Sequence, residues 1–184
     1  MENKEIELKF KISEDIHKMI VKDLNTCAKK VSESRLIDTY YIPEFRDFEI
    51  NGVTQECVRI REKENSNVLC YKKIHYEANP IYCDEYETNV NNKSQMENIL
   101  FALGFKIQMV IDKTRVSYIM DKFEFDIDYV KDLGYLLEVE LKDENAYDQI
   151  YNFVSKYGLS KSDVTYEGIQ ILMKKALHAK QKDK

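Results

Sequence analysis

The stretch EIELKF, residues 5–10, alternates charged and apolar side chains. Side chains of a strand point to opposite faces in turn, so Glu5, Glu7 and Lys9 share one face and the three apolar residues share the other. The stretch therefore predicts a strand with one buried face and one charged face.

The same alternation recurs along the chain. Charged residues two positions apart occur at Arg59 and Arg61, Glu85 and Glu87, Lys113 and Arg115, Glu124 to Asp128, and Glu138 to Lys142. Most of these groups carry one sign of charge, and like charges on one strand face repel each other. A sheet that exposes this face to water is one interpretation. The other is a face that binds a compensating ligand.

The remaining pattern predicts an α+β fold with about eight mostly antiparallel strands. Strands are expected at 5–10, 35–42, 56–63, 67–74, 83–90, 105–119, 122–130 and 135–142, and helices at 13–25, 94–104, 144–158 and about 163–180. Ser13 is a candidate N-cap, and Ser94 with Glu97 matches a capping box. Asn51-Gly52 indicates a hairpin turn.

Closure of about eight strands would convert the charged face into the lining of a tunnel. Clustered carboxylates suit Mg²⁺ or Mn²⁺, whereas Arg and Lys suit a polyanion. A metal-bound triphosphate is the ligand that needs both kinds of group.

Composition limits the setting. A chain of 184 residues predicts one domain spanning residues 1–184, and the net charge of -5 argues against nucleic-acid binding. The sequence has no apolar run of membrane-spanning length, and it starts with a charged segment, so a cytoplasmic location without a membrane partner is expected. The four cysteines form no C-x-x-C pair and are interpreted as reduced packing residues.

The order of these motifs resembles the CYTH family, also called triphosphate tunnel metalloenzymes. The resemblance rests on E-x-E-x-K at residues 5–9, R-x-R at 59–61, Lys72, E-x-E at 85–87, K-x-R at 113–115 and DYVKDLGYLLEVE at 128–140. The segments DTYYIP, DEYETNV and DYVKDLGYLLEVE are most similar to the class IV adenylyl cyclase branch. The resemblance implies a closed eight-stranded antiparallel β-barrel, the tunnel, with helices packed outside. Many relatives have an Arg near the position of Cys83, so one phosphate contact is expected to be missing or moved.

The resemblance also implies roles for individual residues. Substrate phosphates would be bound by Arg59, Arg61, Lys72, Lys113 and Arg115. Metal would be bound by Glu5, Glu7, Glu85, Glu87, Asp126, Glu138 and Glu140. Catalytic roles would fall to Lys9, Glu7 and Asp128, and the cofactor would be Mg²⁺ or Mn²⁺.

The expected function is that of a metal-dependent enzyme acting on a small triphosphate. The preferred reaction is that of a class IV adenylyl cyclase, which converts ATP to cyclic AMP and pyrophosphate. A triphosphatase acting on inorganic triphosphate, thiamine triphosphate or a nucleoside triphosphate is the first alternative, and a non-catalytic polyphosphate-binding or nucleotide-binding module is the second. A monomer or a homodimer is expected.

Overall fold

The computed structural model describes residues 4–182, and its main sheet is closed. This sheet has nine strands in the order β10-β9-β8-β2-β5-β6-β7-β1-β11, and β10 also pairs with β1. Eight antiparallel strands, from β10 to β1, thus form a closed barrel, and the α+β barrel prediction is confirmed. The described chain divides into two compact units: unit 1 comprises residue 4, Arg35–Lys113 and residues 167–182, and unit 2 comprises Glu5–Ser34 and Thr114–Tyr166.

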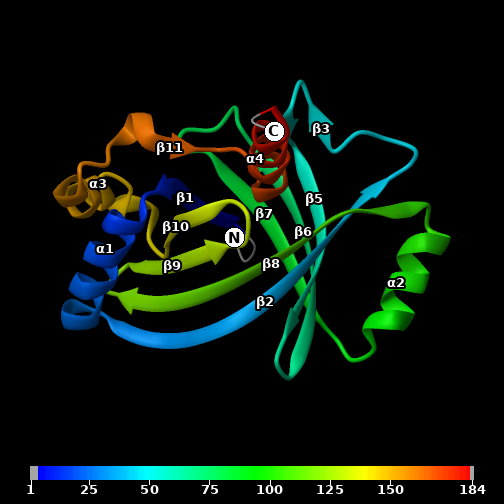
Figure 1. Ribbon diagram of the computed structural model, residues 1–184, viewed down its shortest axis with the longest axis horizontal. Coiled ribbons are helices and arrows are strands. Elements are labelled where there is room, and N and C mark those ends of the chain that lie inside the picture. The colour runs from blue at the N-terminus through cyan, green and yellow to red at the C-terminus, as the bar shows by residue number, and fades with distance from the viewer. Residues whose placement is uncertain (1–3, 183–184) are drawn as a thin grey trace. The chain divides into compact units, whose positions relative to one another are not determined.

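Unit 1 is built on a meander of three strands that lie side by side (Figure 1). Its elements are β3 (Glu49–Ile50), β4 (Val53–Thr54), β5 (Glu56–Lys63), β6 (Ser66–His75), β7 (Tyr82–Val90), α2 (Lys93–Ala102) and α4 (Ile169–Lys182). Two long strands, β2 (Lys29–Pro43) and β8 (Phe105–Met120), contribute residues to both units.

One face of the unit 1 sheet is apolar. Val58 and Ile60 of β5 pack with Tyr41 of β2, Phe48 and Leu100 of α2 in a buried cluster. Residues on the opposite face of β5, with the other parity, are therefore free to carry charge.

Unit 2 combines paired strands with a covering helix. Its elements are β1 (Lys4–Ile12), α1 (Glu14–Cys27), β9 (Phe123–Val130), β10 (Gly134–Leu141), α3 (Gln149–Val154), β11 (Val164–Thr165) and three 3-10 turns, η1 (Glu144–Ala146), η2 (Ser155–Tyr157) and η3 (Lys161–Asp163). The hydrogen-bonded order β1–β10–β9 is antiparallel throughout.

The helix α1 covers the apolar face of unit 2. Ser13 caps it by accepting a hydrogen bond from the backbone N–H of Ile16, as the sequence predicts. Ile20 and Leu24 are fully buried, and α1 packs against β10 (Figure 1). Burial of each of these two side chains contributes about 1.5–3 kcal/mol. The strand residues Ile6 and Leu8 are buried as well, as their parity predicts.

Three local predictions are wrong in detail. The helix α2 is capped by Asn92, whose side chain accepts from the backbone N–H of Gln95, so the Ser94–Glu97 capping box does not form. The expected helix 144–158 is broken into η1, α3 and η2 before Gly158, which has a φ of 77°. The last helix starts at Ile169, because residues 161–165 form η3 and the short strand β11.

The turn predicted at Asn51-Gly52 is confirmed. Asn51 and Gly52, with φ of 51° and 76°, form the turn between β3 and β4. None of the four cysteines forms a disulfide bond, and Cys27 is exposed rather than packed in a core. None of the helices within residues 4–182 has the length and apolar character needed to cross a membrane. Residues 1–3 and 183–184 of the expected single domain lie outside the described part, and the single domain stays a prediction.

Candidate functional site

The charged face of unit 1 is assembled by strand register. Arg61 lies opposite Asp38 of β2, and Arg59 lies opposite Cys70 of β6. Residues opposite each other in a ladder share a face, so these side chains lie on the side of the sheet away from Val58. The parity predicted for Arg59 and Arg61 thus corresponds to a real charged face.

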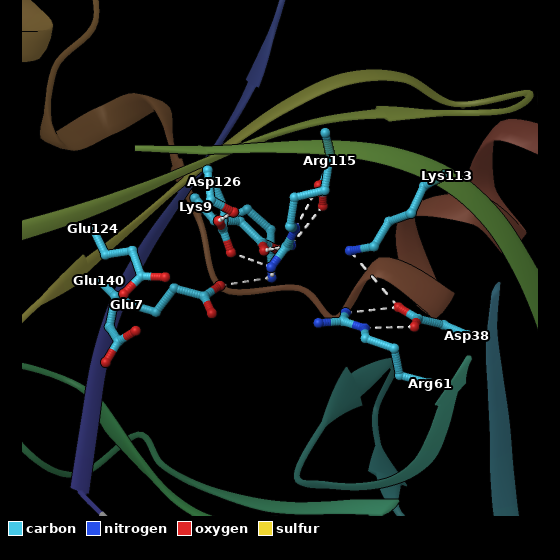
Figure 2. Close-up of polar contacts among 12 residues, drawn as sticks. Glu7, Lys9, Asp38, Arg61, Lys113, Arg115, Glu124, Asp126 and Glu140 are labelled. Carbon is cyan, nitrogen blue, oxygen red and sulfur yellow. Dashed lines mark hydrogen bonds and ion pairs between the residues drawn. The ribbon is translucent and has the colours of Figure 1, made fainter. Parts of the chain in front are cut away.

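Three cations of unit 1 surround one buried carboxylate. Arg61 donates from Nε to Asp38 Oδ1 at 2.7 Å and from Nη2 to Oδ2 at 2.8 Å. Lys113 Nζ lies 3.7 Å and Arg59 Nη1 lies 3.8 Å from the same Oδ2. Figure 2 shows Arg61 and Lys113 approaching Asp38 from different directions. Around Asp38 itself, three positive charges therefore face one negative charge.

The pKa of Asp38 and an unsatisfied donor on Arg59 both agree with this excess of positive charge around Asp38. Burial favours the neutral form of Asp38, but the hydrogen bonds from Arg61 and the charges of Arg59 and Lys113 outweigh it and hold the pKa of Asp38 far below its usual range. Within residues 4–182, Arg59 Nε is one of two buried side-chain nitrogen or oxygen atoms without a hydrogen-bond partner. A buried unpaired donor on a cation is the kind of group that an anionic ligand satisfies.

A second group in unit 1 joins a thiol to two predicted metal ligands. Ligand atoms of Cys70, Glu85 and Glu87 all lie within 4.8 Å of one another. Cys70 Sγ lies 3.1 Å from Glu85 Oε1, and burial raises the pKa of this thiol. Lys72 Nζ forms an ion pair with Glu85 at 3.2 Å, and Arg59 Nη2 lies 3.5 Å from Glu87.

In unit 2 the register brings acids and bases together around Arg115. Glu138 lies opposite both Lys9 of β1 and Asp126 of β9. Arg115 donates from Nε and Nη2 to the two oxygens of Asp128, both at 2.7 Å, and forms further close ion pairs with Asp126 and Glu138. Figure 2 shows this guanidinium among the carboxylates. The partners of Arg115 within the described residues are therefore carboxylates, and its guanidinium is not left open to bind phosphate.

Lys9 bridges two further carboxylates. Its Nζ lies 3.1 Å from Glu7 and 3.2 Å from Glu138. Burial alone would lower the pKa of Lys9, but the two carboxylates outweigh it and raise the pKa above its ordinary value. Lys9 therefore stays cationic at physiological pH and cannot accept a proton as a general base.

The remaining acids of unit 2 repel one another. Glu140 pairs with Lys142 at 2.8 Å and Glu124 with the same ammonium at 3.0 Å. Burial, Glu5 and Glu124 raise the pKa of Glu140 in spite of Lys142. The pKa of Asp126 is also raised, first by burial and then by neighbouring carboxylates. A divalent cation would relieve this repulsion.

Sequence reasoning missed three residues of these clusters. Asp38 is a single acid in an aromatic strand, Ser117 donates to Asp126 Oδ1 at 2.5 Å, and Cys70 was interpreted as a packing residue. The parity of β6 could have found Cys70, because it shares a face with Lys72. Asp38 had only its place opposite Arg61, which requires the strand pairing.

Comparison with models of known families shows which family this chain belongs to. The model of the CYTH domain matches residues 3–165, which is most of the chain. This chain belongs to the CYTH family. The predicted family is therefore confirmed.

Individual CYTH relatives agree with this assignment. A Methanocaldococcus jannaschii protein named "Putative adenylate cyclase" is 30% identical over 148 residues, which cover 79% of this chain and 82% of the relative. A Pyrococcus horikoshii structure has a TM-score of 0.76 at 23% identity and covers 92% of this chain and 99% of its own. A Hippeastrum structure, described as a "putative adenylyl cyclase" with a dominant triphosphatase activity, has a TM-score of 0.66 at 15% identity, with coverage of 94% and 95%. These two structures share the fold.

Proposed function

We propose that this CYTH domain is a metal-dependent enzyme that acts on a triphosphate, with ATP cyclisation to cyclic AMP and pyrophosphate as its reaction. The observation that carries the proposal is the cation cluster of unit 1. Arg59, Arg61 and Lys113 share a single fully buried carboxylate, and the Nε of Arg59 is buried without a partner. Such a cluster gains most from a ligand with several negative charges.

The phosphates would be bound by the residues of this cluster together with Lys72. The two guanidinium groups supply planar pairs of donors, and the two ammonium groups supply compact charges, which suits a chain of phosphoryl groups. Arg115 differs, because its described partners are Asp126, Asp128 and Glu138. We infer that Arg115 mainly holds these three carboxylates in place. It would contact phosphate only once their negative charge is neutralised.

A divalent cation would be held by carboxylates of unit 2, with Glu7, Asp126, Glu138 and Glu140 as the main candidates and Glu5 beside Glu140. Burial is the main cause of the raised pKa values of Asp126 and Glu140, and neighbouring carboxylates add to it; a bound cation would offset both. Oxygen donors of this kind suit Mg²⁺ or Mn²⁺. When bound, the ion would neutralise charge on the reacting phosphoryl group.

Glu85 and Glu87 are a less simple fit for these ions. Their third neighbour is the Cys70 thiol, and sulfur is a poor ligand for Mg²⁺. Lys72 and Arg59 already pair with the two carboxylates. We infer that Glu85 and Glu87 chiefly orient these two cations.

The permanently cationic Lys9 would orient the attacking oxygen or contact phosphate. In the cyclase reaction the ribose 3′-hydroxyl would lose its proton to water or a carboxylate, and its oxygen would form a bond to the α-phosphorus while the bond to pyrophosphate breaks. The name of the Methanocaldococcus jannaschii relative supports this reaction. Hydrolysis of the terminal phosphate by water is the second candidate, and the activity described for the Hippeastrum protein supports it.

The test is incubation with ATP, thiamine triphosphate and inorganic triphosphate, under Mg²⁺ and then Mn²⁺, with cyclic AMP, pyrophosphate and orthophosphate quantified. Cyclic AMP and pyrophosphate in equal amounts from ATP would support the cyclase, and orthophosphate from any substrate would support the triphosphatase. A protein that binds triphosphate, measured as a rise in melting temperature, without turning it over would be a binding module. Binding without turnover, or neither binding nor turnover of any of the three, would contradict the proposed enzyme.

A further inference from the structure

Three Arg–Asp pairs of this chain have the same geometry. In each pair the arginine donates from Nε to Oδ1 and from Nη2 to Oδ2 of the aspartate, at distances between 2.7 and 2.9 Å. The pairs are Arg61 with Asp38, Arg115 with Asp128 and Arg35 with Asp112. Two parallel bonds of this kind fix the plane of a guanidinium as well as its position.

Burial separates the three pairs. The Asp38 and Asp128 side chains are 0% exposed, whereas Asp112 is 36% exposed and its partner Arg35 is 68% exposed. The Arg35–Asp112 pair is screened by water and restrains little. The buried pairs lie in low dielectric, where the same contacts hold the arginine more firmly.

We propose that Asp38 is a positioning residue for the substrate-binding cations, and the proposal rests on the triphosphate chemistry proposed above. Asp38 bonds to Arg61 directly, and its Oδ2 also faces Arg59 Nη1 and Lys113 Nζ. Three buried cations would repel one another and move apart without a carboxylate between them. Asp38 keeps them close together and fixes the direction of the Arg61 guanidinium.

Asp38 acts through these cations rather than on the substrate. Its carboxylate is fully buried, and its negative charge would repel phosphate. The same arrangement recurs in unit 2, where the fully buried Asp128 holds Arg115. In both units, therefore, a fully buried aspartate accepts two hydrogen bonds from one arginine.

The proposal predicts separate effects of Asp38→Asn on kcat and KM. The loss of one bidentate contact lets Arg61 shift, and a misplacement of about 1 Å costs roughly 10²-fold in kcat. Removing a negative charge beside the cations strengthens their attraction for the ground-state triphosphate, so KM should stay constant or fall. Asp38→Glu keeps the charge and should recover part of kcat. Asp112→Asn breaks an exposed pair of the same geometry and should leave both constants at the wild-type values.

The substrate for these assays is whichever of ATP and inorganic triphosphate the wild-type protein turns over, with Mg²⁺ or Mn²⁺ present. Circular dichroism checks that each variant is folded. If Asp38→Asn does not fold, Arg61→Lys decides, because it keeps the cation but cannot form two parallel bonds to one carboxylate. It should lose kcat to a similar extent, with a smaller rise in KM than Arg59→Ala, because it keeps the positive charge.

Several results would overturn the proposal. Wild-type kcat in a folded Asp38→Asn protein, or in Arg61→Lys where Asp38→Asn does not fold, would show that the position of Arg61 does not depend on this pair. A rise in KM with unchanged kcat would assign Asp38 to ground-state binding alone. Either result, in a protein whose wild type is active, leaves the proposed function intact. A wild type that neither binds nor turns over a triphosphate removes the proposed function and this inference with it.

Discussion

The substitution Asp128→Asn should destabilise the protein far more than Asp112→Asn. Both remove one carboxylate from a bidentate pair with an arginine, but Asp128 is fully buried and Asp112 is partly exposed. Breaking a buried pair costs about 3–5 kcal/mol, because the remaining charge stays out of water. Arg115 keeps Asp126 and Glu138 as partners, so the lower end, about 3 kcal/mol, is expected.

The control has the same chemistry without the burial. An exposed pair contributes about 0–1 kcal/mol, so Asp112→Asn should change the free energy of unfolding by less than about 1 kcal/mol. Urea denaturation at pH 7, followed by circular dichroism, measures both values, provided that each protein unfolds in one transition with an unchanged slope. Equal losses in the two variants would refute the reasoning, because burial would then not decide the strength of these pairs.

Three further predictions concern activity and pH. Arg59→Ala should raise KM and lower kcat, because it removes phosphate donors, whereas Arg46→Ala, in an exposed pair, should do neither; steady-state kinetics that leave the KM of Arg59→Ala unchanged would contradict its role. Glu140→Gln should lower kcat by orders of magnitude in a folded protein, and wild-type turnover would remove Glu140 from the metal site. The hydrogen bond to Asp84 raises the pKa of His75, so this pair stabilises the fold below pH 6.5, and its contribution fades as the pH rises through the raised pKa. The difference in unfolding free energy between wild type and Asp84→Asn, measured in urea, should therefore shrink with rising pH. A difference that grows with pH would contradict the assignment.

The strands and their charged faces could be predicted because a period of two is a local property of the sequence. Arg59 and Arg61 show it in four residues, and the bounds of β5 are as predicted. The family could be predicted because the motifs occur in order over most of the chain. The site roles assigned by resemblance stay predictions.

The site residues that the sequence did not reveal depend on contacts between distant segments. Asp38 has aromatic residues after it and no second acid two positions away, so only its pairing with β5 reveals its importance. The role of Asp128 as a partner of Arg115 was hidden in the same way. Asn92 took the cap of α2 from Ser94, and the segment 144–158 broke although its apolar spacing is helical, because packing and local side-chain bonds override propensity.

The position of Arg115 among three carboxylates also bears on how the protein reaches its native state. A cluster of buried acids has to be protonated or compensated by positive charge when the chain folds. Here the compensating cation is part of the polypeptide, because Arg115 contacts Asp126, Asp128 and Glu138 directly. We therefore expect this part of the chain to fold without free divalent ions, including in a chelator, so that ion supply would govern the activity of the protein rather than its folding.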